Sequence, residues 1–269
     1  MKKSKAIKKA ARKAAPAPDP VAKLDVAEGV EGMKQAIGIM TDPAAALAQR
    51  KAALNALQGA SFGHPNFKEI RGEYVAGLRQ VVDDAPQELL QDALEILSQE
   101  QDPYAEKKLV DGLRDDKKAL VKPEDALHYL SYNLHAGVQG VVRNVFEQSK
   151  DDRVRQQAVR LMSSDPQAVK LIERTLKDKK ESAEVRQTSA AALHALNPQA
   201  LQKWAEKTAL DKNENQEILA ACLTAINQFG DEKTISKNTA FRKRISQMSK
   251  NAPPRLKQIA KGLSTKYGI

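Results

Sequence analysis

The sequence has little cysteine, few aromatic residues and no long apolar run. A single cysteine, Cys222, among 269 residues excludes an internal disulfide and a zinc site built from several thiolates. No apolar stretch approaches the ~18 residues that a membrane-spanning helix needs, so no transmembrane segment is expected. The basic start lacks the apolar region of a secretory signal. We therefore expect a cytoplasmic protein, with an organelle presequence as the open alternative.

Recognisable catalytic motifs are also missing. The sequence contains no Gly-rich phosphate loop, no GxSxG element and no paired carboxylates in a familiar frame. Its four histidines show neither i, i+4 pairing nor an acidic neighbour at ligand spacing: His64, His128, His135 and His194. The prediction is a chain with no catalytic residues, no metal site and no cofactor, which is not an enzyme.

The charge is distributed unevenly, although the formal net charge is +10. Residues 1–23 carry eight Lys or Arg and one acid, and residues 233–269 carry ten Lys or Arg and no acid. Residues 24–232 carry 26 basic and 33 acidic side chains. The chain is therefore expected to have a basic tail with a Pro-rich linker (1–23) and a folded part (24–269), which consists of an acidic body (24–232) and basic C-terminal units (233–269).

The positive charges of the basic tail repel one another and the tail has few apolar residues, so no stable helix is predicted there. Its composition favours a solvated, disordered segment on a Pro-stiffened linker. The alternative is an arm that contacts an acidic partner. The anion-binding candidates in the tail are Lys2, Lys3, Lys5, Lys8, Lys9, Arg12 and Lys13.

A repeated pattern runs through the folded part. Residues 154–162 (VRQQAVRLM) return as residues 185–193 (VRQTSAAAL), with apolar or small side chains at i, i+4, i+7 and i+8. That spacing forms one stripe on an α-helix. Related frames start at residues 49, 89, 126, 218 and 256, so the interval is 28 to 40 residues. This spacing predicts about six to seven repeats of two helices joined by short turns.

The second helix of a repeat is visible between these frames. Leu201, Trp204, Ala205 and Thr208 form one stripe after Asn197-Pro198, a pair typical of a helix start. This periodicity places Trp204 in the core. Cys222 occupies the small central position of its frame, where we expect it to be buried and inert.

The repeated pattern resembles that of HEAT repeats. Residues 151–158 (DDRVRQQA) nearly match the first helix of that family, in which an Asp precedes Val-Arg and a later Ala, and residues 182–186 (SAEVR) are close. The resemblance implies an all-α fold, a right-handed armadillo-like α-solenoid. The recurrent Arg155 and Arg186 are expected to form inter-repeat ion pairs or caps, with a row of anion-binding guanidinium groups as the alternative.

The resemblance also implies a protein-binding scaffold or adaptor. We expect it to dock an acidic or helical protein partner on the surface formed by the second helices. The aromatic segment 128–135 adds two tyrosines off the apolar stripe, although partial burial against a neighbouring repeat is the competing interpretation. The partner-binding candidates are Arg143, Lys170, Arg174, Lys203, Lys207, Tyr129 and Tyr132.

Two other functions stay open. The first is sequence-independent nucleic-acid binding through phosphate contacts of the basic ends. Its C-terminal candidates are Arg242, Lys243, Arg244, Arg255 and Lys257. The second, more remote, comes from the rare HEAT-like enzymes, the DNA glycosylases and bilin lyases, which would need an aromatic residue in their groove.

Residues 61–67 are expected to form a longer loop between helices.

Overall fold

The computed structural model describes residues 29–269, where the chain forms fifteen α-helices and no β-strand. This confirms the all-α prediction. The chain divides into two compact units, the first ending at Leu97 and the second running from Ser98 to Ile269. The expected boundary between residues 23 and 24 and the seven basic candidates of the tail lie outside the described residues.

In the first unit, α1 packs against both α2 and α3. Met33, Leu57 and Ile70, one from each of these helices, are fully buried. The loop expected at residues 61–67 is short, because α2 continues to Gly63 and α3 begins at Phe67. The helices are α1 (Val30–Thr41), α2 (Leu47–Gly63), α3 (Phe67–Asp84) and α4 (Gln87–Gln99), which continues two residues past the division.

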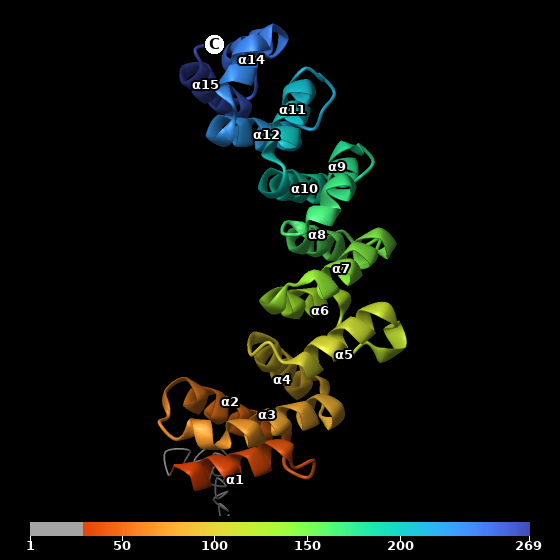
Figure 1. The fold of residues 1–269 in the computed structure, drawn as a ribbon, viewed down its shortest axis with the longest axis vertical. Helices are drawn as coiled ribbons and strands as arrows, with labels where there is room; N and C mark the ends of the chain where they lie inside the picture. Colours follow the sequence, from red (N-terminus) through yellow and green to blue (C-terminus); the bar gives the residue numbers. More distant parts are fainter. Residues whose placement is uncertain (1–28) are drawn as a thin grey trace, which may run out of the picture. The chain divides into compact units, whose positions relative to one another are not determined.

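The second unit is a solenoid of stacked helix pairs (Figure 1). One layer is a continuous stack in which α8 packs on α6, α10 on α8, α12 on α10 and α15 on α12. The other layer contains α5, α7, α9, α11 and α14, and each of these packs on a helix of the first layer. The helices are α5 (Pro103–Arg114), α6 (Pro123–Leu130), α7 (Ala136–Gln148), α8 (Asp152–Met162), α9 (Val169–Lys177), α10 (Ala183–Leu196), α11 (Pro198–Ala209), α12 (Gln216–Phe229), α13 (Glu232–Lys237), α14 (Thr239–Asn251) and α15 (Pro254–Tyr267).

The predicted repeat frames coincide with helices α2, α4, α6, α8, α10, α12 and α15. A small residue at the centre of each frame allows neighbouring helices to approach closely. In six frames that residue is completely buried: Ala53, Ala93, Ala158, Ser189, Cys222 and Ala260. Burial also raises the pKa of the Cys222 thiol far above its usual value, so this thiol stays protonated and unreactive.

An arginine at the second position of the frame ties a helix to the end of the preceding one. Arg50 donates from Nε to the carbonyl of Met40 at the end of α1, and Arg186 donates from Nε to the carbonyl of Leu176 at the end of α9, both at 2.9 Å. Carbonyls in the last turn of a helix have no partner within that helix. Both arginines are buried, so these side chains are structural caps and do not form an exposed anion-binding row.

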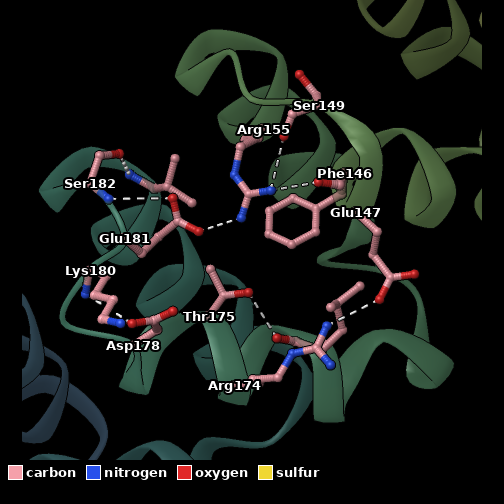
Figure 2. A network of polar contacts seen from close by, with 12 residues as sticks. Phe146, Glu147, Ser149, Arg155, Arg174, Thr175, Asp178, Lys180, Glu181 and Ser182 are labelled. Atoms are coloured by element: carbon pink, nitrogen blue, oxygen red, sulfur yellow. Dashed lines mark hydrogen bonds and ion pairs between the residues drawn. The ribbon is translucent and has the colours of Figure 1, made fainter.

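Arg155 makes the same connection between α7 and α8. Its guanidinium donates to the carbonyls of Phe146 and Ser149 at 2.7 and 3.2 Å and lies over the Phe146 ring. It also forms an ion pair with Glu181, which lies in the turn before α10 (Figure 2). One side chain of α8 therefore links the end of α7 to the turn between α9 and α10.

Replacing Arg186 is expected to destabilise the second unit strongly. Arg186 forms a bidentate ion pair with Glu214, with both N–O distances 2.9 Å and each side chain only 4% exposed. Arg186→Met would leave the Glu214 carboxylate buried without its partner, and this type of change costs roughly 3–5 kcal/mol. The measurement is urea unfolding followed by circular dichroism. Arg160→Met, at an exposed arginine, is the control, and equal stability of the two variants would contradict the assignment.

The same ion pair predicts a pH dependence of stability. Burial by itself raises the pKa of Glu214, but hydrogen bonds from Arg186 and from the backbone N–H of Asn215 outweigh burial and hold the pKa below its usual 4.5. A lowered carboxylate pKa stabilises the fold above the unfolded-state pKa, and the stabilisation disappears as the pH falls through the folded-state pKa. We expect the difference in urea midpoint between the native chain and Glu214→Gln to be largest above pH ~5 and to shrink below 4.5. The exposed Glu184→Gln should show no comparable trend.

Candidate ligand-binding groove

One face of helix α11 does not pack against other helices. The helix begins at Pro198, and the side chain of Asn197 accepts a hydrogen bond from the backbone N–H of Ala200 at 3.0 Å. Leu201 and Ala205 are buried against the solenoid. Lys203 and Trp204, and Lys207 one turn further along the helix, therefore lie together on the other side.

This face of α11 forms a groove with α9 and the turns that follow the two helices. The groove has a cavity volume of about 730 Å³. Glu173 and Lys177 line it from α9, whereas Lys179, Asp211 and Glu214 line it from the turns. A cavity of this size matches the range of ligand-binding pockets.

Most charges in the groove neutralise one another. Lys177 pairs with Glu173 at 2.9 Å, Lys179 pairs with Asp211 at 2.5 Å, and Glu214 pairs with Arg186. The hydrogen bond from Lys179 is the main cause that holds the pKa of Asp211 below its usual value. Lys203 and Lys207 remain as two ammonium groups with no partner among residues 29–269. The groove therefore carries two uncompensated positive charges, one on each side of Trp204 along α11.

Trp204 is not a core residue, and the prediction that it would be is wrong. Its side chain is half-buried and lines the groove. Trp204 lies at the edge of the buried stripe of α11, where Leu201 and Ala205 already fill the space against the neighbouring helices. The sequence periodicity located the helix correctly, but it could not distinguish the centre of the stripe from its edge.

A second cavity, shallow and widely open to solvent, adjoins the groove along α9. It has a volume of about 570 Å³ and shares Glu173 and Lys177 with the groove. Lys170 and Arg174, both predicted partner-binding residues, line it. Arg174 pairs with Glu147 at 3.1 Å, while Lys170 has no partner in the described part of the chain. Four of the predicted residues, Lys170, Arg174, Lys203 and Lys207, thus lie around one extended, continuous depression.

The other three predicted partner-binding residues lie elsewhere and are less accessible. Arg143 forms an ion pair with the buried Asp165 and donates to Gln167 at 2.9 Å, so it ties α7 to the start of α9. Tyr129 is only 9% exposed, which makes it a core residue and corrects the placement off the apolar stripe. Tyr132 is half-buried, and its ring contacts that of His128.

The predicted anion-binding arginines near the C-terminus are all engaged within the chain. Arg242 donates to the carbonyl of Gly268 at 2.9 Å, and Arg244 donates to the carbonyl of Ala209 at 3.0 Å. Arg255 forms an ion pair with Glu217. Lys243 is exposed and Lys257 half-exposed, and neither has a partner within residues 29–269.

Some groove residues had no distinguishing sequence signal. Lys179, Asp211 and Glu214 lie in turns outside the repeat frame, and only the folded chain brings them together around one cavity. Within residues 29–269, no group of three or more His, Cys, Asp or Glu side chains is arranged to hold a metal ion. None of the helices described here combines the length and apolarity needed to cross a bilayer.

Comparison with known proteins gives distant likenesses to solved structures. Human deoxyhypusine hydroxylase, solved in complex with glycerol, is 16% identical, and the match covers 88% of this chain and 96% of that one with a TM-score of 0.38. No family model and no curated protein matches the sequence. This neighbour is an enzyme, so the expectations of a non-catalytic scaffold or adaptor and of a chain that is not an enzyme are corrected and are not kept. At this TM-score the likeness transfers no activity, substrate or residue.

The single tryptophan makes the charge of the groove measurable. Iodide is an anion and should concentrate near Lys203 and Lys207, so it should quench Trp204 fluorescence efficiently at low salt. In a Lys203→Gln/Lys207→Gln variant, we expect the iodide quenching constant to fall roughly twofold, because the local potential is lower. Quenching by neutral acrylamide should not change. Equal losses with both quenchers would indicate that the substitutions altered the exposure of Trp204 instead of the charge around it.

Proposed function

We propose that the groove between α9 and α11 binds an acidic polypeptide segment with an apolar anchor residue. The observation that carries this proposal is the position of Trp204 between two unpartnered lysines, Lys203 and Lys207, in a cavity of about 730 Å³. Tryptophan offers a large, rigid apolar surface and is enriched among the residues that dominate binding energy. The two lysines, four residues apart on α11, would receive carboxylates of the bound segment.

The shape of the depression supports an extended ligand. The groove and the adjoining cavity share Glu173 and Lys177, so a ligand seated on Trp204 could continue along α9 towards Lys170 and Arg174. A compact small molecule would occupy one cavity only. A polypeptide can follow both cavities and place acidic side chains at successive lysines.

The carboxylates in the groove favour polypeptide over nucleic acid. Glu173 and Asp211 line the same surface as the lysines, and a phosphate backbone, which is charged at every nucleotide, would pass close to both. Single-stranded nucleic acid is bound by grooves that are positive along their length and carry aromatic side chains for successive bases. This groove has one aromatic side chain, and carboxylates lie among its lysines.

The proposal concerns what the groove binds, and it does not depend on whether the chain then modifies its ligand. We further propose that the helix pairs are HEAT-like, which the arginine caps of Arg50, Arg155 and Arg186 support. In each case the arginine occupies the same position of the frame and donates to a carbonyl at the end of the preceding helix, as expected of a repeating unit. Cytoplasmic location stays a prediction.

The test is selection of peptides from a random display library on the full chain. We expect the selected peptides to share at least two acidic residues and one large apolar residue. A selected peptide should change Trp204 emission saturably. Lys203→Glu/Lys207→Glu should weaken its binding roughly tenfold or more, because two exposed charge pairs become repulsive.

Lys243→Glu/Lys250→Glu is the matched control, with the same change in net charge at exposed positions on α14. This control should bind the peptide almost as well as the native chain at 0.15 M salt. Equal losses in the two variants would show non-specific attraction and would overturn the groove assignment. Selection of peptides without acidic residues, or tighter binding of oligo(dT) than of any selected peptide at the groove, would overturn the choice of ligand.

A further inference from the structure

A second surface, on helices α14 and α15, differs chemically from the groove. Residues 233–269 contain ten Lys or Arg and no acidic residue. Three of the ten are the arginines Arg242, Arg244 and Arg255, which bind backbone carbonyls or Glu217. Lys266 likewise donates to the carbonyls of Asn227 and Gln228 at the end of α12. These four side chains hold the helices together.

Of the six remaining lysines, the four on α14 and α15 point away from the contacts that hold the helices together. Lys243 and Lys250 are two turns apart on the side of α14 opposite the buried Phe241, Ile245 and Met248. Lys257 and Lys261 lie one turn apart on α15, on the flank away from Gly262 and Lys266, which contact α12. Because α14 packs on α15, one helical hairpin carries all four ammonium groups, and none has a partner in the described chain.

This surface offers positive charge and no apolar anchor. The aromatic residues of this segment, Phe241 and Tyr267, are 0% and 6% exposed, so neither can stack on a base or anchor a protein partner. Protein interfaces depend on a buried apolar centre, which this surface does not provide. Lysine ammonium groups bind phosphate as point charges, and contacts of this kind to a phosphate backbone carry no sequence information.

We infer that the lysine face of α14 and α15, formed by Lys243, Lys250, Lys257 and Lys261, binds the phosphate backbone of duplex nucleic acid without sequence preference. The site is separate from the groove of α9 and α11 and does not depend on the function proposed there. Its free energy would come mainly from the release of counterions condensed on the duplex, so binding should weaken steeply with salt.

The experiment measures binding of a fluorescein-labelled 24-bp DNA duplex to the full chain by anisotropy between 50 and 200 mM NaCl. The variant Lys243→Gln/Lys250→Gln/Lys257→Gln/Lys261→Gln should reduce the slope of log K against log salt by about 3 to 4, since each phosphate contact contributes about 0.9. Its affinity at 50 mM salt should fall at least tenfold. Two duplexes of unrelated sequence should bind equally.

The matched control removes four other exposed lysines of the second unit, in Lys117→Gln/Lys122→Gln/Lys150→Gln/Lys212→Gln. It has the same net charge and keeps the basic tail, so any loss specific to the first variant belongs to α14 and α15. Equal losses in both variants, or an unchanged slope in the first, would overturn the site. A 20-residue poly-glutamate that competes equally per unit charge would overturn nucleic acid in favour of an acidic protein. Thermal melting by circular dichroism confirms that both variants are folded.

Discussion

The solenoid depends on how each helix end is satisfied. The last carbonyls of a helix have no hydrogen-bond partner within that helix. A stack of short helices contains many such ends. In this chain an arginine of the following helix closes several of them, as Arg50 does for α1, Arg155 for α7 and Arg186 for α9. Arg244 does the same for α11 from outside the repeat frame. The guanidinium group suits this position because its fork of donors can serve a carbonyl and a carboxylate simultaneously.

These caps divide the basic residues into two classes. The arginines near helix ends donate to carbonyls and pair with acidic residues such as Glu181 and Glu214. Both partners of these ion pairs are largely buried, so the contacts are shielded from water. The lysines that remain have long flexible stems and strongly hydrated ammonium groups, which makes them poor internal caps and good surface charges. At the two proposed surfaces the positive charge available for ligands therefore lies with the lysines, although arginine and lysine look equivalent in a net-charge count.

The fold could be predicted from the sequence because the fold is periodic. The spacing of apolar residues located the first helices, and small residues such as Ala158 and Cys222 marked the close contacts between layers. Tertiary position was harder to predict. Trp204 and Tyr129 differ from their predicted burial because each lies near the boundary of an apolar stripe, where the rotation of the helix by a fraction of a turn decides exposure. The groove residues Lys179 and Asp211 lie in turns, for which periodicity contains no information.

The two proposed surfaces differ because of what surrounds their lysines. Around Lys203 and Lys207, carboxylates neutralise the neighbouring cations and an indole supplies apolar area, so a ligand must match charge and shape together. Around Lys257 and Lys261 no acidic residue of the same segment competes and the aromatic side chains are buried, so a ligand needs only a high density of negative charge. On the two proposals, the same chain would contact two ligands of different classes. Each surface contains four lysines, and on the two proposals the selectivity comes from the acidic and aromatic residues next to them.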